Sequence, residues 1–276
     1  MGLGDLSFAA VASLRSIDNW IATINSNMAG SGRVGYKATQ VKFVGGAVTT
    51  ERPISSPRLG ISVAEQSLSI AQTSINYSQG AVTASTDFTH LAIQRTTAAP
   101  GMFVLNSEED GSGDFFFTFD GEFFLNTQGQ LVNSDGLYVM SDRDGNGVVD
   151  GVIGDDPADI VNDQIALNRL AVYVEPTPQL LLRFSRFGAT IFERVEDAPN
   201  DPLDANKVAA IDAIGNYNAA GQGSGRVIPF ALESSNASLT AAVPELALAQ
   251  KMYSAISKVI QVAFANIDTA LQLGPR

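Results

Sequence analysis

The sequence predicts a mainly β central region with long N- and C-terminal α-helices that pair as a coiled coil. Three observations predict this fold class. Apolar residues recur at helical spacing at both ends of the 276-residue chain, short β-branched and aromatic runs fill the middle, and acidic charge gathers there. The predicted boundaries are 1–43 plus 232–276 for a discontinuous helical assembly domain, and 44–231 for a β-rich outer domain with acidic loops.

The first helix is predicted over about residues 3–28. Its apolar residues follow one another at spacings of seven, four and three, which places them on one stripe of a helix. The stripe consists of Leu3, Ala10, Leu14, Ile17, Ile21, Ile24 and Met28. Gly30 and Gly32 follow and favour the end of the helix, because glycine readily adopts a positive φ.

The second helix is predicted over about residues 241–272, with Ser238 or Thr240 as its cap and Pro244 near its first turn. Neither apolar stripe has a partner nearby in sequence, so each is expected to pack against the other or against neighbouring copies. The predicted assembly interface comprises Leu14, Ile17, Ile21, Ile24, Met28, Leu246, Tyr253, Ile256, Ile260, Phe264 and Ile267.

The region between the helices reads as strands. Its β-branched and aromatic runs are divided by Gly, Asp and Asn, which favour turns. The clearest runs are residues 115–119, 122–125, 131–132, 137–140, 170–174 and 180–184.

Charge separates the ends from the middle and excludes several functions. Residues 51–236 hold ten basic and 25 acidic side chains, and 106–163 alone hold 14 acids and one base. A net charge of −12 argues against a nucleic-acid surface. With no cysteine and one histidine, the chain lacks the ligands of a structural zinc site. No apolar run is long enough to insert into a membrane, and the N-terminus lacks the basic start of a signal peptide.

One segment has the ligand spacing of a calcium loop. Oxygen ligands stand at positions 1, 3, 5 and 9 and glycine at position 6, although position 12 is Ile153 rather than Glu. The candidate ligands are Asp142, Asp144, Asn146 and Asp150. The same residues also favour an ordinary turn between strands. No other cofactor is predicted.

Two further patterns favour structural interpretations. His90 lies near Ser85 and Asp87, but no nucleophile elbow accompanies them, so His90 is interpreted as a packing or surface residue. The glycine-rich stretch 221–225 lacks the lysine of a phosphate loop and reads as a loop. No catalytic residue is predicted.

Three segments in the expected order resemble the bacterial flagellar rod and hook proteins, the axial family. The segments are residues 1–43, roughly 79–140, and 225–271, while about 145–225 matches nothing in the family pattern. The residues that fit its motifs are Asn27, Gly35, Tyr36, Lys37, Gly121, Phe123, Gly129, Asn236, Gln250 and Lys258. The length suits a distal-rod-type member. Departures from the motifs, such as Ser26 and Gly30 in place of two asparagines, keep a divergent paralogue as the alternative.

The resemblance implies a non-catalytic structural subunit that assembles into a helical axial filament through its terminal helices. It implies copies of the chain itself, other axial rod and hook proteins and a flagellar-type export apparatus as partners. The implied location is the flagellar basal body or a similar cell-surface filament, reached without a cleaved signal peptide. The alternative hypothesis is a secreted calcium-dependent binding or adhesion module that uses the acidic loop 142–156.

Overall fold

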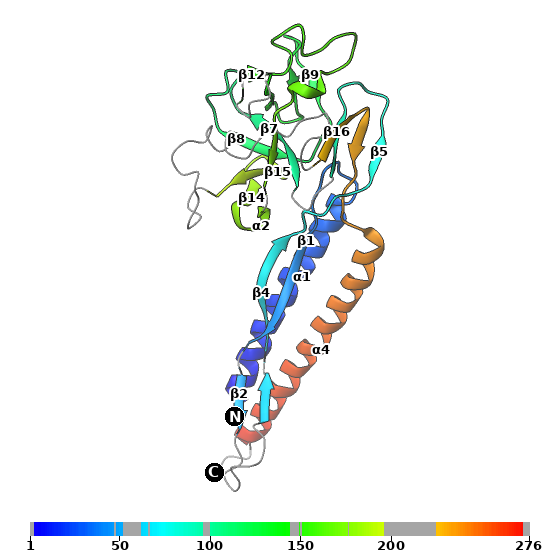
Figure 1. Ribbon diagram of the computed structural model, residues 1–276. Helices are drawn as coiled ribbons and strands as arrows, with labels where there is room; N and C mark the ends of the chain where they lie inside the picture. The colour runs from blue at the N-terminus through cyan, green and yellow to red at the C-terminus, as the bar shows by residue number, and fades with distance from the viewer. Residues whose placement is uncertain are drawn as a thin grey trace. The chain divides into compact units, whose positions relative to one another are not determined.

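The chain forms two compact units (Figure 1). The computed structural model describes residues 3–46, 48–51, 62–65, 67–95, 100–143, 149, 151–175, 177–195 and 225–272. The first unit, called the helical unit here, consists of Met1–Ala29, Thr39–Ser74 and Ser238–Arg276. The second, called the β unit, consists of Gly30–Ala38 and Ile75–Ala237. Residues 44–74, which the predicted boundaries assign to the outer domain, therefore lie in the helical unit.

The helical unit contains the two expected helices and two small sheets. Helix α1 spans Leu3–Gly30 and helix α4 spans Leu239–Gln272. The backbone N–H of Ala241 donates to the carbonyl and to the hydroxyl of Ser238, which is one of the two predicted caps. One sheet pairs β1 (Thr39–Gly45) with β4 (Leu68–Ile75), and the other pairs β2 (Val48–Glu51) antiparallel to β3 (Ser62–Glu65).

The core of the helical unit joins both helices to a strand. Ile17 and Ile24 of α1 are buried with two alanines of α4, Ala242 and Ala249. Residues packed around them are Trp20, Ile21, Met28, Leu68, Leu246, Met252 and Ile256. Of these, Leu68 belongs to β4. The apolar stripe of α1 is therefore covered by the β1–β4 sheet as well as by α4.

Contacts with the sheet explain this arrangement along α1. Trp20 packs edge-on against Phe43 of β1, with ring centroids 5.2 Å apart. The backbone N–H of Leu68 donates to the Ser13 hydroxyl at 2.8 Å. Figure 1 shows β1 and β4 running beside α1. One side of the helix is thus occupied by strands that the heptad pattern does not reveal.

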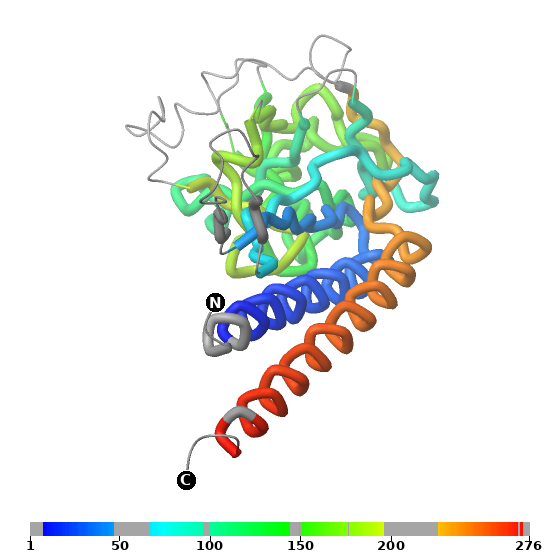
Figure 2. The backbone as a smooth tube through the Cα atoms, turned by 90° about the horizontal axis from the view of Figure 1, so that it is seen from below, coloured from blue at the N-terminus to red at the C-terminus, as the bar shows by residue number. Residues whose placement is uncertain are grey.

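The predicted coiled coil is therefore wrong. The molecule has one N-terminal helix, one C-terminal helix and mostly antiparallel sheets, and Figure 2 shows α4 diverging from α1 toward its C-terminal end. Tyr253, Phe264 and Leu271, which a continuous seam would bury, are 38%, 55% and 74% exposed. The physical reason is that heptad spacing specifies an apolar face without specifying its partner, and here strands share the face of α1.

The β unit is built on one nine-stranded sheet, in the order β14-β15-β8-β7-β11-β10-β9, with β12 paired to β11 and β13 to β7. Its strands are β7 (Gly101–Asn106), β8 (Phe115–Thr118), β9 (Phe124–Leu125), β10 (Leu131–Val132), β11 (Tyr138–Ser141), β12 (Gly151–Val152), β13 (Val172–Val174), β14 (Leu182–Ser185) and β15 (Gly188–Arg194). Two short pairs adjoin it: β6 (Leu91–Arg95) with β16 (Gly225–Pro229), and β5 (Val82–Ala84) with β17 (Ala231–Glu233). A 3₁₀ turn, η1 (Leu167–Arg169), and a one-turn helix, α2 (Pro178–Leu181), precede β13 and β14 respectively.

Both faces of this sheet are buried at its central strand, β7. All six residues of β7 are buried, and they alternate between two apolar clusters, with Phe103 and Leu105 in one and Met102 and Val104 in the other. Alternate residues of a strand point to opposite faces, so a core on each side requires a continuous apolar run. The central position of β7 explains why residues 101–105 contain no polar side chain.

The core of the helical unit can be tested at Ile17, which is fully buried. Replacing a buried isoleucine by alanine leaves a cavity and costs about 2–5 kcal/mol. We expect Ile17→Ala to lower the melting temperature measured by circular dichroism at a helix-sensitive wavelength. The matched control is Val11→Ala on the same helix, where the side chain is 41% exposed. Equal melting temperatures for the two variants would contradict this packing.

Candidate functional site

The backbone passes between the two units four times, after residues 29, 38, 74 and 237. The parts of the β unit next to these passages are bonded to one another. The N–H of Asn76 donates to the Ala38 carbonyl at 2.8 Å, and the N–H of Asn236 donates to the Tyr36 carbonyl at 3.2 Å. Three segments that are distant in sequence thus meet at one place in the β unit.

A buried ion pair lies at this place. Lys37 Nζ is 2.5 Å from Glu233 Oε1, and their side chains are 1% and 4% exposed. Lys37 also donates to the Ser78 carbonyl at 3.2 Å, and its ammonium lies 4.1 Å from the centre of the Phe119 ring. The same Glu233 oxygen accepts the N–H of Gly80 at 2.8 Å. Both charges therefore have several partners, as buried charges require.

Burial controls the titration of the lysine. Removal from water lowers the pKa of Lys37 below its ordinary value, and nearby Arg95 acts in the same direction. The attraction and hydrogen bond of Glu233 oppose this shift without cancelling it. Burying both charges therefore costs free energy of folding, and the hydrogen bonds from the surrounding groups offset part of that cost.

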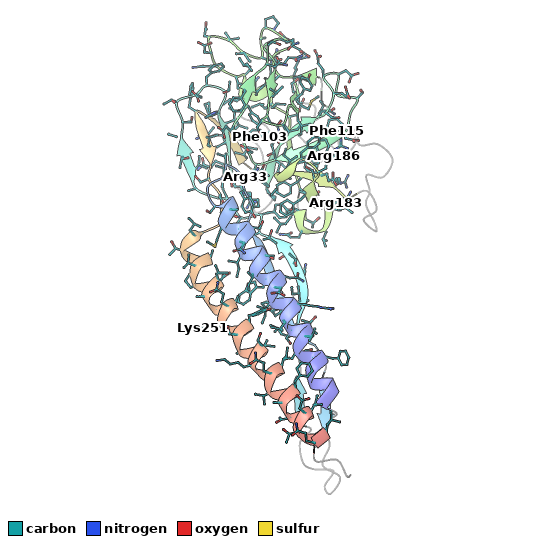
Figure 3. All side chains as sticks on the ribbon, turned by 180° about the vertical axis from the view of Figure 1, so that it is seen from behind. Arg33, Phe103, Phe115, Arg183, Arg186 and Lys251 are labelled. Atoms are coloured by element: carbon teal, nitrogen blue, oxygen red, sulfur yellow. The ribbon has the colours of Figure 1, made fainter. Side chains whose placement is uncertain are left out.

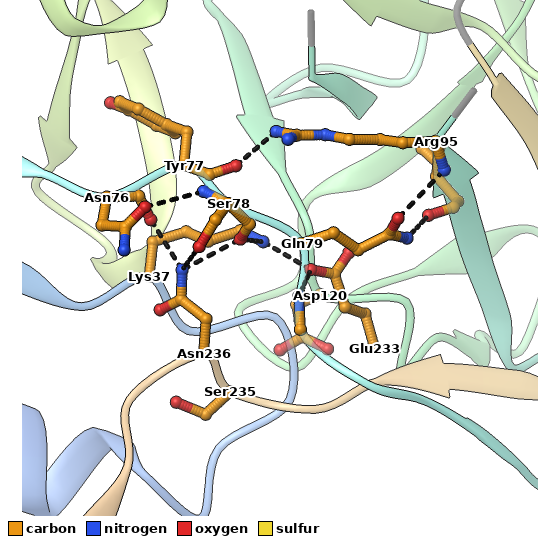
Figure 4. Close-up of polar contacts among 12 residues, drawn as sticks. Lys37, Asn76, Tyr77, Ser78, Gln79, Arg95, Asp120, Glu233, Ser235 and Asn236 are labelled. Atoms are coloured by element: carbon orange, nitrogen blue, oxygen red, sulfur yellow. Dashed lines mark hydrogen bonds and ion pairs between the residues drawn. The ribbon is translucent and has the colours of Figure 1, made fainter. Parts of the chain in front are cut away.

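Asn236 uses its whole side chain to join the same segments. Its amide Nδ2 donates to the carbonyls of Asn76 and Ser78 at 2.7 and 2.9 Å, and its Oδ1 accepts the N–H of Ala38 at 2.6 Å. Figure 4 shows the bonds of the Asn236 amide nitrogen and those of Lys37. We call Lys37, Ser78, Glu233 and Asn236 the polar clamp.

Glycines allow the backbone to approach closely beside the clamp. Gly35 has φ +66°, and a Cβ there would lie 2.4 Å from the backbone nitrogen of Asp120. A Cβ on Gly121 would overlap the Leu91 carbonyl oxygen. Gly129, in the turn between β9 and β10, makes no such close approach and is required instead for its φ of +86°. Larger side chains at these three positions would strain the backbone or displace it.

Asp120, beneath Gly35, is the most strongly perturbed carboxylate near the clamp. Its pKa is raised to about 6, chiefly by burial and in part by repulsion from Glu122 and Asp135. A hydrogen bond from the Glu122 N–H and the attraction of Arg33 partly oppose this. At neutral pH the group is therefore ionised at a cost to the folded state.

The structure brings some of the predicted motif residues together and leaves others apart. Gly35, Tyr36, Lys37 and Asn236 meet at the clamp, and Tyr36 is buried beside Gly30. Phe123 is fully buried and packs edge-on against Phe103. In the helical unit, the Asn27 amide pairs with both backbone groups of Thr39, at 2.7 and 2.8 Å, while Gln250 and Lys258 are exposed on α4.

Sequence reasoning missed three of the polar groups at this site, namely Ser78, Glu233 and Asp120. Glu233 and Asp120 lie inside segments that resemble the axial family, next to the predicted residues Asn236 and Gly121. That proximity was the available signal. It did not reveal that Glu233 is buried opposite Lys37, because 196 residues separate the two in sequence.

The predicted assembly residues divide into two groups. Ile17, Ile21, Ile24, Met28, Leu246 and Ile256 belong to the core of the helical unit. Leu14, Ile260 and Ile267 are half-buried, and Tyr253 and Phe264 are exposed. The exposed members extend onto a face of α4 that neither the core nor a described strand covers.

Three of the four predicted calcium ligands, Asp144, Asn146 and Asp150, lie outside the described residues. The fourth, Asp142, donates its backbone N–H to the Arg169 carbonyl at 2.7 Å. Within the part of the chain that the structure describes, no group of three or more His, Asp or Glu side chains is placed to hold a metal ion. The calcium hypothesis stays a prediction.

His90 lies in a local turn. Its Nδ1 is 2.7 Å from the Ser85 hydroxyl, which also accepts the Asp87 N–H at 3.3 Å. Its Nε2 is 3.6 Å from the Asp87 carboxylate, a side chain that is 67% exposed. The three residues therefore stabilise one another within six positions of sequence, which agrees with the structural interpretation of His90.

The molecule thus consists of two units. Both terminal helices belong to one unit, and in the β unit the polar clamp joins three segments that are distant in sequence. Residues 229–273 match the family described as the flagellar basal body rod FlgEFG protein C-terminal. Residues 229–273 are thus similar to the C-terminal region of this family, and the match does not distinguish one member from another. The match covers Glu233 and Asn236 of the clamp and all but the first residues of the third resembling segment.

The comparison supports a structural component of the flagellum. No curated protein matches the chain in sequence. Among the described residues, no helix is long and apolar enough to span a membrane.

The ion pair of the clamp gives a direct test of this site. Lys37→Met leaves Glu233 as an unpaired buried charge, which costs about 3–5 kcal/mol. We expect a large loss of stability in urea unfolding, largely recovered in the double variant Lys37→Met/Glu233→Leu. The control is Arg183→Met, which removes an ion pair with Glu193 whose arginine is 61% exposed, and which should cost less than about 1 kcal/mol. Additive effects of the two clamp substitutions would contradict the pairing.

Asp120 makes the stability depend on pH in a definite direction. The folded protein keeps its proton up to about pH 6, whereas the unfolded chain releases it near pH 3.8, so stability falls as pH rises between these values. We expect Asp120→Asn to raise the melting temperature at pH 7.5, and the gain to shrink steadily as the pH is lowered toward 4. Asp18→Asn, at an exposed position of α1 that does not contribute to the shift of Asp120, is the control and should change little at either pH. A gain for Asp120→Asn that stays constant across this range would refute the assignment.

Proposed function

We propose that this chain is a non-catalytic subunit of a flagellar axial filament and that it self-assembles through its terminal helices. The single observation that carries the proposal is the exposed apolar surface of α4. Single exposed apolar residues are normal on a protein surface, whereas a continuous series on one helix marks an interaction site. Eight large apolar side chains of α4 are more than a third exposed: Leu239, Val243, Leu248, Tyr253, Val259, Val262, Phe264 and Leu271.

These side chains lie on both sides of the buried face of α4. Ala242, Ala249 and Ala263 are buried, and all three fall on one row with a spacing that is a multiple of seven. At 100° per residue, Leu248, Val259 and Val262 lie on one side of that row. Val243, Tyr253 and Phe264 lie on the other side. One helix therefore offers separate apolar surfaces to two neighbours in addition to its contact with α1.

Two different contact surfaces on one subunit suit an open helical assembly. A filament needs heterologous contacts that do not close into a ring. A pair of apolar stripes on either side of one helix meets this need, because each copy then contacts one neighbour on each side. Assembly with other axial rod and hook proteins, and delivery by a flagellar-type export apparatus without signal-peptide cleavage, belong to the same proposal and rest on the family.

The experiment substitutes each stripe separately in the full chain. Val262→Asp and Phe264→Asp place a charge on opposite sides of the buried row, at side chains that are 59% and 55% exposed. We expect both variants to keep the circular dichroism of the parent. Self-association measured by sedimentation velocity should weaken at least tenfold, because the charge is desolvated only in the assembly.

Gln261→Asp is the matched control, since this exposed residue directly precedes Val262 in sequence and gains the same charge. It should associate and form tubes in electron micrographs as the parent does. Tubes that form equally well with Val262→Asp and Phe264→Asp would overturn the proposal, as would a parent protein that stays monomeric at every concentration.

A further inference from the structure

Lys37 and Glu233 hold an amine and a carboxyl group in contact inside the β unit (Figure 4). Lys37 Nζ lies 2.5 Å from Glu233 Oε1, and both side chains are almost completely buried. Well-oriented groups in one molecule react as if they were present at about 10⁵–10⁸ M, a concentration that free groups never reach in solution. The fold therefore meets the first requirement for the condensation of a lysine with a carboxylic acid to an amide.

Burial favours such an amide over the charged pair. Two ions removed from water carry a large desolvation cost, and the hydrogen bonds around them offset only part of it. Burial also lowers the pKa of Lys37 below its ordinary value, which increases the share of the neutral amine that can act as a nucleophile. An amide carries no net charge, so its formation removes both ions from the interior of the β unit.

The groups around the pair are placed to assist this condensation. The N–H of Gly80 donates to Glu233 Oε1 at 2.8 Å, so it stabilises the negative charge that this oxygen gains when an amine attacks the carboxyl carbon. The Ser78 carbonyl accepts a hydrogen bond from Lys37 Nζ at 3.2 Å and fixes the position of the nitrogen. The buried ring of Phe119 covers the amine, with its centre 4.1 Å from Nζ, and so helps to exclude water.

We propose that Lys37 and Glu233 form an intramolecular isopeptide bond after the β unit has folded. A proton first passes from Nζ to the carboxylate along their hydrogen bond, which gives a neutral amine and a carboxylic acid. The amine then attacks Cδ, the Nζ–Cδ bond forms, and Oε1 carries the negative charge of the intermediate. The Cδ–Oε2 bond breaks last, and this oxygen departs as water with two protons that came from Nζ. The reaction needs no further reactant.

The bond changes what holds the two ends of the β unit together. Lys37 and Glu233 are 196 positions apart, so the amide closes a very long loop and leaves the unfolded chain fewer conformations. The ion pair is the state of the freshly folded chain, and the amide is the state that follows it. Urea unfolding of freshly folded protein therefore measures the ion pair. This inference goes beyond the proposed function and does not depend on it.

The test measures the mass of the intact, full-length protein. The chain is refolded from urea and incubated at neutral pH, and samples taken over time are unfolded and analysed by mass spectrometry. We expect the mass to fall by one water molecule in most of the protein, and digestion with trypsin to release a peptide in which Lys37 is joined to Glu233. The same protein kept in urea is the matched control. It should keep its full mass, because its amine and carboxyl group are not held together.

A second measurement follows the amine itself. Reductive methylation of the unfolded samples should label Lys37 completely at the start of the incubation and leave it unlabelled once the bond has formed. Lys251, an exposed residue of α4 (Figure 3), is the internal control and should be labelled equally at every time. Lys37→Arg keeps a positive charge beside Glu233 but has no amine that can be deprotonated, so the mass of this variant should stay constant.

Two outcomes would contradict the bond. A folded parent whose mass and Lys37 labelling stay constant through the incubation overturns the inference. Loss of ammonia in place of water, with Lys37 joined to Asn236, overturns the assignment of Glu233 as the acid that reacts. Both readouts are made on single unfolded chains, so they do not depend on whether the protein forms filaments.

Discussion

The buried ion pair of Lys37 and Glu233 is the interaction on which the rest of the structure depends. The two residues are 196 positions apart, and each belongs to a segment that leads directly into the helical unit. Because both charges are removed from water, their partners must be complete, and Ser78, Gly80 and Phe119 supply them. The pair therefore fixes three segments at once, and Asn236 fixes the same three through uncharged hydrogen bonds.

The two units differ in where their apolar side chains lie. The β unit buries an apolar cluster on each side of its central strand, and most of its described carboxylates are exposed. The helical unit leaves much of α4 apolar and exposed, so its contacts are hydrophobic and depend weakly on salt.

Particular residues show which features of the fold and the site could be predicted from the sequence. The stripes predicted over 3–28 and about 241–272 correspond to α1 and α4, because amphipathic spacing is a local property. The coiled coil failed because the partner of a stripe is a tertiary property: Trp20 of the stripe region packs on Phe43 of a strand. The clamp showed the same limit. Lys37 and Asn236 were recognised from motifs, whereas their shared partners Ser78 and Glu233 emerged only when distant segments were brought together.

The discontinuous helical unit has a consequence for the order of folding. The β unit is almost entirely one continuous segment, Ile75–Ala237, but α1 and α4 lie at opposite ends of the chain. Bringing two points about 200 residues apart together costs roughly 5 kcal/mol of chain entropy. Once Lys37 contacts Glu233 in the folded β unit, this loss of chain entropy has already occurred. The two helices then follow segments that are held together by the clamp. The β unit thus acts as a template that makes helix contact nearly local, so the helical unit should be the last part of the chain to become ordered.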